Sequence, residues 1–127
     1  MTITTLHGTR VLVCADDGPA LATDRDATDL LSEAFSEQAE LVAVPVARLD
    51  DRFFALRTGV AGTIVQKLVQ YRTRLAVVGD ISAHVAASNS LRDFVIEANR
   101  GREVWFVPDL AALAARLSGQ RVPREDG

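Results

Sequence analysis

Short apolar runs of strand character alternate with amphipathic helical segments along most of the chain. Apolar runs cover residues 10–15, 41–44, 74–79 and 103–107, and a stretch with apolar residues at helical spacing follows each of them. The run at 74–79 carries no polar side chain after its first residue, which is typical of a strand covered on both faces. Strands that alternate with helices pair in parallel through right-handed crossovers. The alternation therefore predicts an α/β fold with a mixed, mainly parallel sheet.

The start of the chain departs from this alternation. "TITTLHGTRVLVCADD" places β-branched and apolar residues on both sides of His7-Gly8, which predicts two short antiparallel strands joined by a tight turn. The expected order is hairpin, helix, strand, helix, strand, helix, strand, helix. A chain of 127 residues suits one domain with its own core. We therefore expect a single domain over residues 1–117 and a flexible tail over residues 118–127.

Polar residues predict where the helices begin. The helical segments cover residues 26–38, 59–71, 90–101 and 109–117, and the expected caps are Asp26, Thr58, Ser90 and Asp109. Ser90 with Asp93 resembles a capping box, and Gly101 stands where a C-terminal cap is expected. Pro45 cannot donate a backbone hydrogen bond, so the strand at 41–44 should end there or lie at a sheet edge.

Composition limits the classes of function. The chain carries 17 acidic and 14 basic residues and has a net charge of −3, which disfavours nucleic-acid binding because such proteins normally have a basic excess. Its single cysteine, Cys14, excludes an intramolecular disulfide and favours a reducing compartment. The sequence shows neither a signal-peptide pattern nor a stretch of ~20 apolar residues. We therefore expect a cytoplasmic protein without membrane contact.

The longest connections fall on one rim of the predicted sheet. Each helix starts just beyond the carboxyl end of the preceding strand, so the junctions at residues 48–58, 80–90 and 108–109 should share one rim. Open α/β folds bind ligands at this rim, and long ordered loops are often functional. The opposite rim carries the short returns at 71–74 and 99–102, which are interpreted as plain connectors.

Polar and glycine residues at these junctions are the candidate contacts for a ligand or partner: Thr58, Gly59, Gly62, Asp80, Ser82, Ser90 and Arg92. The first turn of a helix offers unpaired N–H groups to an anion, and glycine lets a ligand approach the backbone. The same residues also have structural interpretations. Thr58 can cap a helix, Asp80 can hold its own loop together, and Arg92 can belong to a solvated helix face.

The sequence contains no recognisable catalytic or metal-ligating set. His7 and His84 have no partner at ligand spacing, and one cysteine forms no cluster, so we expect neither a metal nor a cofactor. Ser82, Ser88 and Ser90 lie outside the sequence context of a nucleophile elbow. The protein is therefore expected to be non-enzymatic.

Several motifs together resemble a bacterial family. The segments "FFALRTGVAGTIVQKLVQYRTRLAVVGDIS" and "NSLRDFVIEANRGREVWFV" closely resemble the bacterial domain-of-unknown-function family 4180, and the resemblance extends over residues 10–117. The specific pieces include "TGVAG", "SLRDF" and Gly79-Asp80. Membership in this family implies no established activity, substrate or catalytic residue.

The order of elements also resembles the STAS domain, found in anti-sigma-factor antagonists and sulfate-transporter tails. In that family, a Ser or Thr followed by Gly opens the helix after a central strand and can be phosphorylated by a partner kinase. Thr58-Gly59 falls at the corresponding place, so the resemblance implies a STAS-like fold and phosphorylation of Thr58. The Asp-Ser pair that precedes this position in the usual motif is Leu56-Arg57 here.

Two functions follow from these observations. The first is a regulatory or protein-interaction module that a partner protein contacts over the rim carrying Thr58, Asp80 and Ser90. The second is a sensor for a small anionic ligand, or an unrecognised enzyme, that uses the same rim with Asp80 and Arg92 as contacts. An exposed sheet edge would also allow a homodimer.

Overall fold

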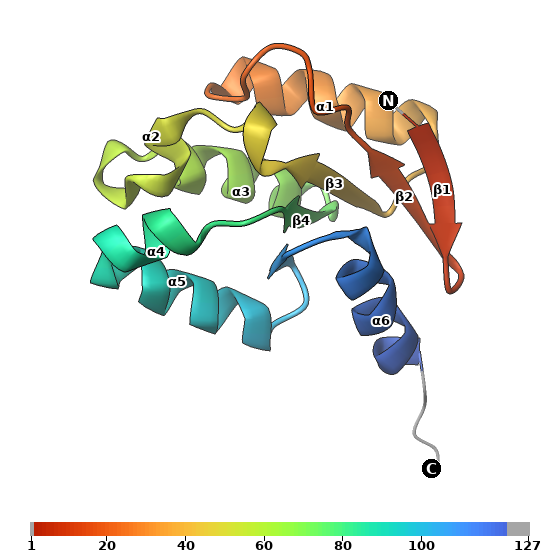
Figure 1. Cartoon of the computed structure of the whole chain (residues 1–127). Helices are drawn as coiled ribbons and strands as arrows, with labels where there is room; N and C mark the ends of the chain where they lie inside the picture. The colour runs from red at the N-terminus through yellow and green to blue at the C-terminus, as the bar shows by residue number, and fades with distance from the viewer. Residues whose placement is uncertain (1, 122–127) are drawn as a thin grey trace.

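Five strands form one sheet, and their order in space repeats their order along the chain (Figure 1). The computed structural model describes residues 2–121. The strands are β1 (Thr2–Leu6), β2 (Thr9–Val13), β3 (Leu41–Pro45), β4 (Arg74–Val78) and β5 (Val104–Val107). β1 and β2 pair antiparallel, and β2 to β5 pair in parallel. The predicted α/β class, with its hairpin and mainly parallel sheet, is confirmed.

A long helix follows each parallel strand. These helices are α1 (Asp24–Ser36), α3 (Val60–Gln70), α5 (Asn89–Arg100) and α6 (Leu110–Arg121). The connection before α3 contains η1 (Val46–Arg48), α2 (Asp51–Phe54) and η2 (Leu56–Thr58), and the connection before α5 contains α4 (Ser82–Ala87). The short helices α2 and α4 are absent from the predicted order, because four and six residues are too few to show a helical period.

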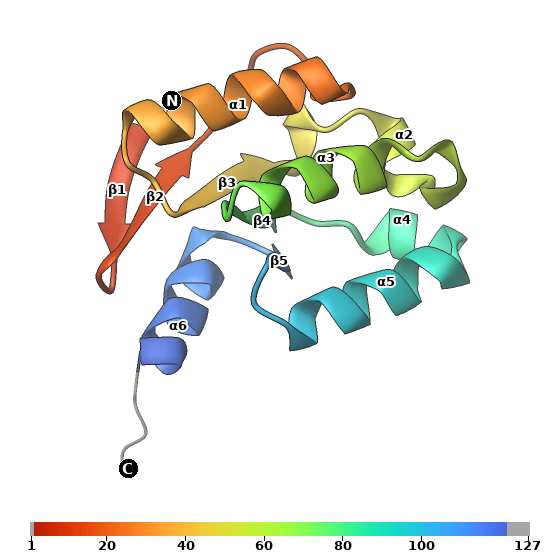
Figure 2. The same cartoon turned by 180° about the vertical axis from the view of Figure 1, so that it is seen from behind.

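Helices α1, α3 and α5 cover one face of the sheet, and α6 crosses the other (Figures 1 and 2). Because consecutive strands are neighbours, every right-handed crossover steps in the same direction and leaves its helix on the same face. Alternate strand residues face the two layers. Leu75 and Val77 pack with the α1–α3–α5 layer, whereas Ala76 packs with Leu113 and Leu117 of α6. α6 contacts both edge strands, β1 and β5.

Two helices begin earlier than the sequence predicts. The predicted cap Asp26 is wrong, because Thr23 caps α1 and accepts the Asp26 N–H, while the Asp26 carboxylate accepts backbone N–H groups in return. The predicted cap Ser90 is also wrong, because the Ser88 hydroxyl accepts the Leu91 N–H. Both segments hold several Ser, Thr or Asp residues close together. The route by which the chain leaves the sheet determines which of these residues becomes the N-cap of the helix.

The start of α3 also differs from the prediction, which places the cap at Thr58. Gly59 is the N-cap, in the left-handed region with φ of 80°, where a residue with a Cβ would be strained. The predicted cap of α6 is confirmed, because the Asp109 carboxylate accepts the Ala112 N–H at 2.8 Å. Pro45 ends β3 as predicted, although β3 is a central strand.

The C-terminal helix extends past the predicted end of the domain. α6 runs to Arg121, so residues 118–121 of the predicted tail continue this helix. Residues 122–127, the rest of that predicted tail, lie outside the described part of the chain. No helix within residues 2–121 is long and apolar enough to cross a membrane.

A buried arginine holds the connection between β2 and α1. The Arg48 side chain is 7% exposed, and it donates from Nε to the Pro19 carbonyl at 2.9 Å and from Nη1 to the Ala15 carbonyl at 3.1 Å. Gly18 lies against the guanidinium, and a Cβ at that position would come within 2.9 Å of Arg48 Cζ. Nearby, burial raises the pKa of the Cys14 thiol, in line with its predicted role as a small buried side chain.

The capping box of α1 should make unfolding depend on pH. The backbone N–H groups of Ala22 and Thr23 hold the pKa of Asp26 below its ordinary value, so the unfolded chain, with an Asp pKa of about 3.9, binds this proton more readily. The stabilisation by the Asp26 carboxylate is fully present above a pH of about 3.9, and it is lost as the pH falls through the pKa of Asp26 in the folded state. Urea unfolding of wild type and Asp26→Asn from about pH 5 to about pH 2 should show the stability difference shrinking as the pH falls. A difference that stays constant across this range would contradict the assignment.

Candidate functional site

Two connections lie side by side beyond the carboxyl ends of β3 and β4 (Figures 1 and 2). The first covers residues 46–59 and contains α2 with its flanking 3₁₀ turns, and the second covers residues 79–88 and contains α4. They meet where the rings of Phe54 and His84 stack, with centroids 4.2 Å apart and ring planes 13° apart. This stack joins the two connections into one surface.

Buried phenylalanines anchor the first connection. Phe53 is 0% exposed within the main core, and Phe54 meets it edge-on at a centroid distance of 5.2 Å. Asp50 caps α2 and accepts hydrogen bonds from the side chain and backbone of Arg52, both at 2.9 Å, which lower the pKa of Asp50. A four-residue helix is not stable by itself, so this packing and capping hold α2 in place.

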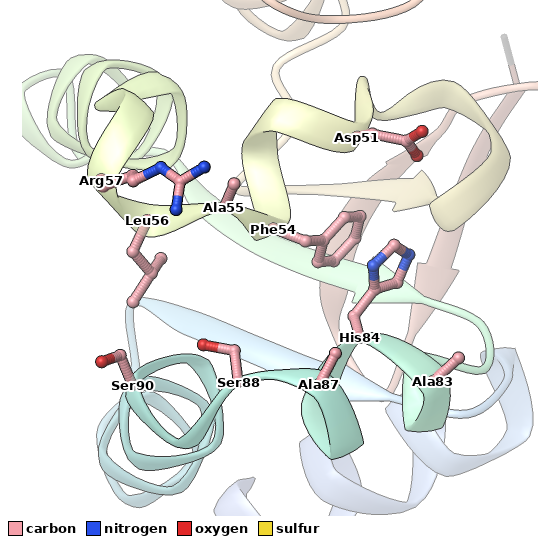
Figure 3. Close-up of a pocket in the computed structure, with 10 residues that line it drawn as sticks. All are labelled: Asp51, Phe54, Ala55, Leu56, Arg57, Ala83, His84, Ala87, Ser88 and Ser90. Atoms are coloured by element: carbon pink, nitrogen blue, oxygen red, sulfur yellow. The ribbon is translucent and has the colours of Figure 1, made fainter.

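A groove of about 880 Å³ lies between the two connections (Figure 3). Its volume falls within the roughly 300–1,000 Å³ of small-molecule sites. One wall comes from α2 and η2, and the other comes from α4 and the start of α5. We call it the rim groove, and ten residues line it: Asp51, Phe54, Ala55, Leu56, Arg57, Ala83, His84, Ala87, Ser88 and Ser90.

Polar groups stand on both walls of the rim groove. Figure 3 shows Arg57 on one wall, Ser88 and Ser90 on the facing wall, and the stacked rings farther along. Arg57 forms no ion pair and no side-chain hydrogen bond with any residue between 2 and 121. A guanidinium in this state can bind a carboxylate or a phosphate. Within the described residues, no group of three or more His, Cys, Asp or Glu side chains could hold a metal ion.

Thr58 and Gly59 shape the end of the first connection. The Thr58 hydroxyl lies 2.7 Å from the Arg52 carbonyl oxygen and 2.8 Å from that of Ala55, and it can donate its one proton to either. The hydroxyl oxygen also accepts the Val60 N–H at 3.3 Å. These contacts tie η2 back to α2, and Gly59 then reverses the chain into α3.

Most of the other predicted contacts do not line the rim groove. The Asp80 carboxylate accepts the Ser82 N–H at 2.9 Å, and this bond, with one from the Ser82 hydroxyl, lowers the pKa of Asp80. Gly62 is exposed on α3, and Arg92 is exposed on α5. Among the residues named as candidates from sequence, Ser90 is the one that lines the rim groove.

Sequence reasoning missed most of the groove lining. It gives Arg57, beside Thr58, the same two interpretations as Arg92, a contact for an anion or a solvated side chain, and it considers His84 only as a metal ligand. No local pattern links Phe54 to His84, which meet because β3 and β4 are neighbours. The usable signal was a histidine within a run of small residues, "SAHVAAS", directly after a strand that ends at the ligand-binding rim.

Comparisons with known proteins agree with the motif resemblance. A family model described as "Domain of unknown function (DUF4180)" matches residues 6–117, which is most of the chain. The predicted family is confirmed, and so is the predicted extent of similarity over residues 10–117. No curated protein and no solved structure shows significant similarity to the chain.

Proposed function

The chain belongs to the DUF4180 family of domains of unknown function, and because membership assigns no activity, we propose a function from the rim groove. The protein is a non-enzymatic sensor module that binds a small organic anion there. The observation that carries the proposal is the position of Arg57, a guanidinium without an ion pair among the described residues, on the wall that faces Ser88 and Ser90.

The rim groove suits a ligand with an anionic group at one end and a flat or apolar body. Arg57 can hold a carboxylate or phosphate through two parallel N–H···O bonds, and the Ser90 hydroxyl can donate to the same group. Phe54, Leu56 and the alanines of α4 offer apolar surface for the body. Asp51 also lines the groove and would repel a second anionic group.

Two contacts support binding rather than turnover. The Ser88 hydroxyl is the N-cap of α5 and accepts the Leu91 N–H at 3.1 Å. The His84 imidazole lies face to face with the Phe54 ring, which holds it against the wall of the groove. An activated nucleophile needs an adjacent base within hydrogen-bond reach, and within residues 2–121 no hydrogen bond joins His84 to the hydroxyl of Ser88 or Ser90.

A ligand in the rim groove would touch both connections. Residues 46–59 and 79–88 come from different strands, so a ligand that contacts both walls favours the arrangement in which the walls are correctly spaced. The outer surface of the two connections then reports whether the groove is occupied. This supports a regulatory role in which a partner protein recognises the liganded rim.

Native mass spectrometry of the purified protein tests the proposal. The wild type is expected to carry a non-covalent small-molecule mass that is lost on denaturation. Arg57→Ala is expected to lose this mass in native spectra, because removal of a charge-assisted contact weakens binding about tenfold or more.

Arg25→Ala is the matched control for this experiment, since Arg25 is an exposed arginine on α1 that does not line the groove. The control should keep the adduct. An adduct retained by Arg57→Ala would move the ligand away from the rim groove. A wild type that stays bare after incubation with organic phosphates and dicarboxylates would remove the proposal altogether.

A further inference from the structure

The rim opposite the rim groove holds another cavity, and three of its six lining residues are arginines. It occupies about 330 Å³ and is lined by Val69, Arg72, Thr73, Arg74, Arg102 and Glu103. These residues extend from the end of α3 to the first residue of β4, and along the turn from α5 into β5. The sequence interpretation treats both turns as plain connectors, yet the parallel pairing of β4 with β5 brings them together. We call this space the arginine cavity.

One side-chain and one backbone hydrogen bond join the two turns. The Arg74 Nε donates to the Arg102 carbonyl oxygen at 2.7 Å, and the Leu75 N–H donates to the Glu103 carbonyl oxygen at 2.9 Å. Arg72 occupies the left-handed region with φ of 58°, which closes the turn within a few residues. The arginines are therefore presented by a defined backbone rather than by a long loop.

The residues that line the arginine cavity carry a net positive charge. Three arginines face one carboxylate, that of Glu103. Within residues 2–121, Arg72 and Arg102 form no ion pair and no side-chain hydrogen bond. Guanidinium groups keep their charge at every physiological pH. Two of the three cations are thus available to a ligand.

Neighbouring charges add to this positive field. Arg74 and Arg116 flank the ring of Trp105, with guanidinium carbons 4.5 and 4.2 Å from its centroid. Burial lowers the pKa of Arg74, repulsion from Arg102 and Arg116 lowers it further, and Glu40 acts in the opposite direction. A bound anion would offset the repulsion that the folded protein already contains.

We propose that the arginine cavity binds the phosphate groups of a small molecule that carries at least two negative charges. The guanidinium fork matches the oxygen geometry of phosphate and can make paired hydrogen bonds to it. Glu103 offsets one of the three arginines, so a dianion gains more attraction than a monoanion. The volume of the cavity lies at the lower end of small-ligand sites, which suits a compact diphosphate. The site is on the other rim and is independent of the rim groove.

Isothermal titration calorimetry with inorganic pyrophosphate at physiological ionic strength tests this site on the full chain. The wild type is expected to bind, and pyrophosphate should also raise its melting temperature. Arg72→Gln and Arg102→Gln should each weaken binding about tenfold, because each removes a charge-assisted hydrogen bond. Glutamine keeps a polar side chain of similar reach and leaves the turn backbone as it is.

Three controls test whether binding depends on the position of the arginines, on phosphate and on correct folding of the variants. Arg25→Gln removes an exposed arginine elsewhere and should bind pyrophosphate like the wild type. Citrate carries comparable charge without phosphate and should bind more weakly than pyrophosphate. The melting temperatures of all variants without ligand should not fall below that of the wild type, which shows that the variants are folded.

Three results would overturn the assignment. The first is a wild type that shows neither heat nor a rise in melting temperature with pyrophosphate. The second is unchanged affinity in both cavity variants, and the third is equal affinity for citrate and pyrophosphate. The adduct expected in the rim groove should persist in Arg72→Gln and Arg102→Gln, so the two proposals succeed or fail separately.

Discussion

Phe53→Ala is expected to lower the free energy of unfolding by about 3–5 kcal/mol. The Phe53 side chain is fully buried in the main core, so its truncation removes buried apolar area and leaves a cavity. Its ring also supports Phe54, which lines the rim groove. Domains of this size are stable by only about 5–15 kcal/mol. One substitution in α2 should therefore remove a large share of the total stability.

Phe35→Ala provides a control with the same chemical change. Phe35 is 75% exposed on α1, so its truncation should alter the free energy of unfolding by about 0.5 kcal/mol or less. Urea denaturation of the two variants and the wild type measures both values. Similar losses in the two variants would mean that Phe53 is not packed as described and that α2 is not anchored to the core.

Gly79→Ala is expected to destabilise the protein by about 2–4 kcal/mol. Gly79 follows β4 with φ of 140°, a conformation that side chains rarely adopt. A Cβ at this position would also lie 2.9 Å from the Val46 Cγ2 atom. The alanine must therefore adopt a strained backbone and displace Val46, which belongs to the first connection of the rim. The loss should appear in urea denaturation as a lower midpoint with an unchanged slope.

Gly62→Ala is the matched control, and it should act in the opposite direction. Gly62 lies in α3 with no neighbouring atom within 4 Å of an added Cβ. Alanine should stabilise the helix by about 0.5–1 kcal/mol, because it reduces the conformational entropy of the unfolded chain. A loss of stability in this variant would show that the glycine is required for close packing against α3.

Much of the fold could be predicted because it depends on periodic patterns. The apolar run of β4 and the helical stripe of α5 each extend over enough residues to reveal their spacing, and their alternation determines the class of sheet. Helix starts were harder to predict, since Thr23, Asp24 and Asp26 are all suitable caps by residue type. The path of the chain in the folded protein determines which of these residues caps the helix, and the local sequence does not determine that path.

Both cavities depend on contacts between segments far apart in the chain. The Phe54–His84 stack joins residues 30 positions apart, and the hydrogen bond between Arg74 and Arg102 spans 28. Each partner stands in a stretch that has an ordinary local interpretation, such as a loop or a short return. These residues meet because the pairing of β3 with β4 and of β4 with β5 places the connections next to each other. A single sequence therefore indicates the rim but not which side chains meet there.

A sheet whose spatial order repeats the chain order can grow one strand at a time during synthesis. Each new strand finds its partner already at the exposed edge, so no strand has to enter between two others. Each addition closes a loop that contains a single crossover, which keeps the entropy of loop closure small. α6 is the exception, because it reaches back to β1, the first strand of this sheet along the chain. α6 thus covers a face that the strands synthesised before it have left open to solvent.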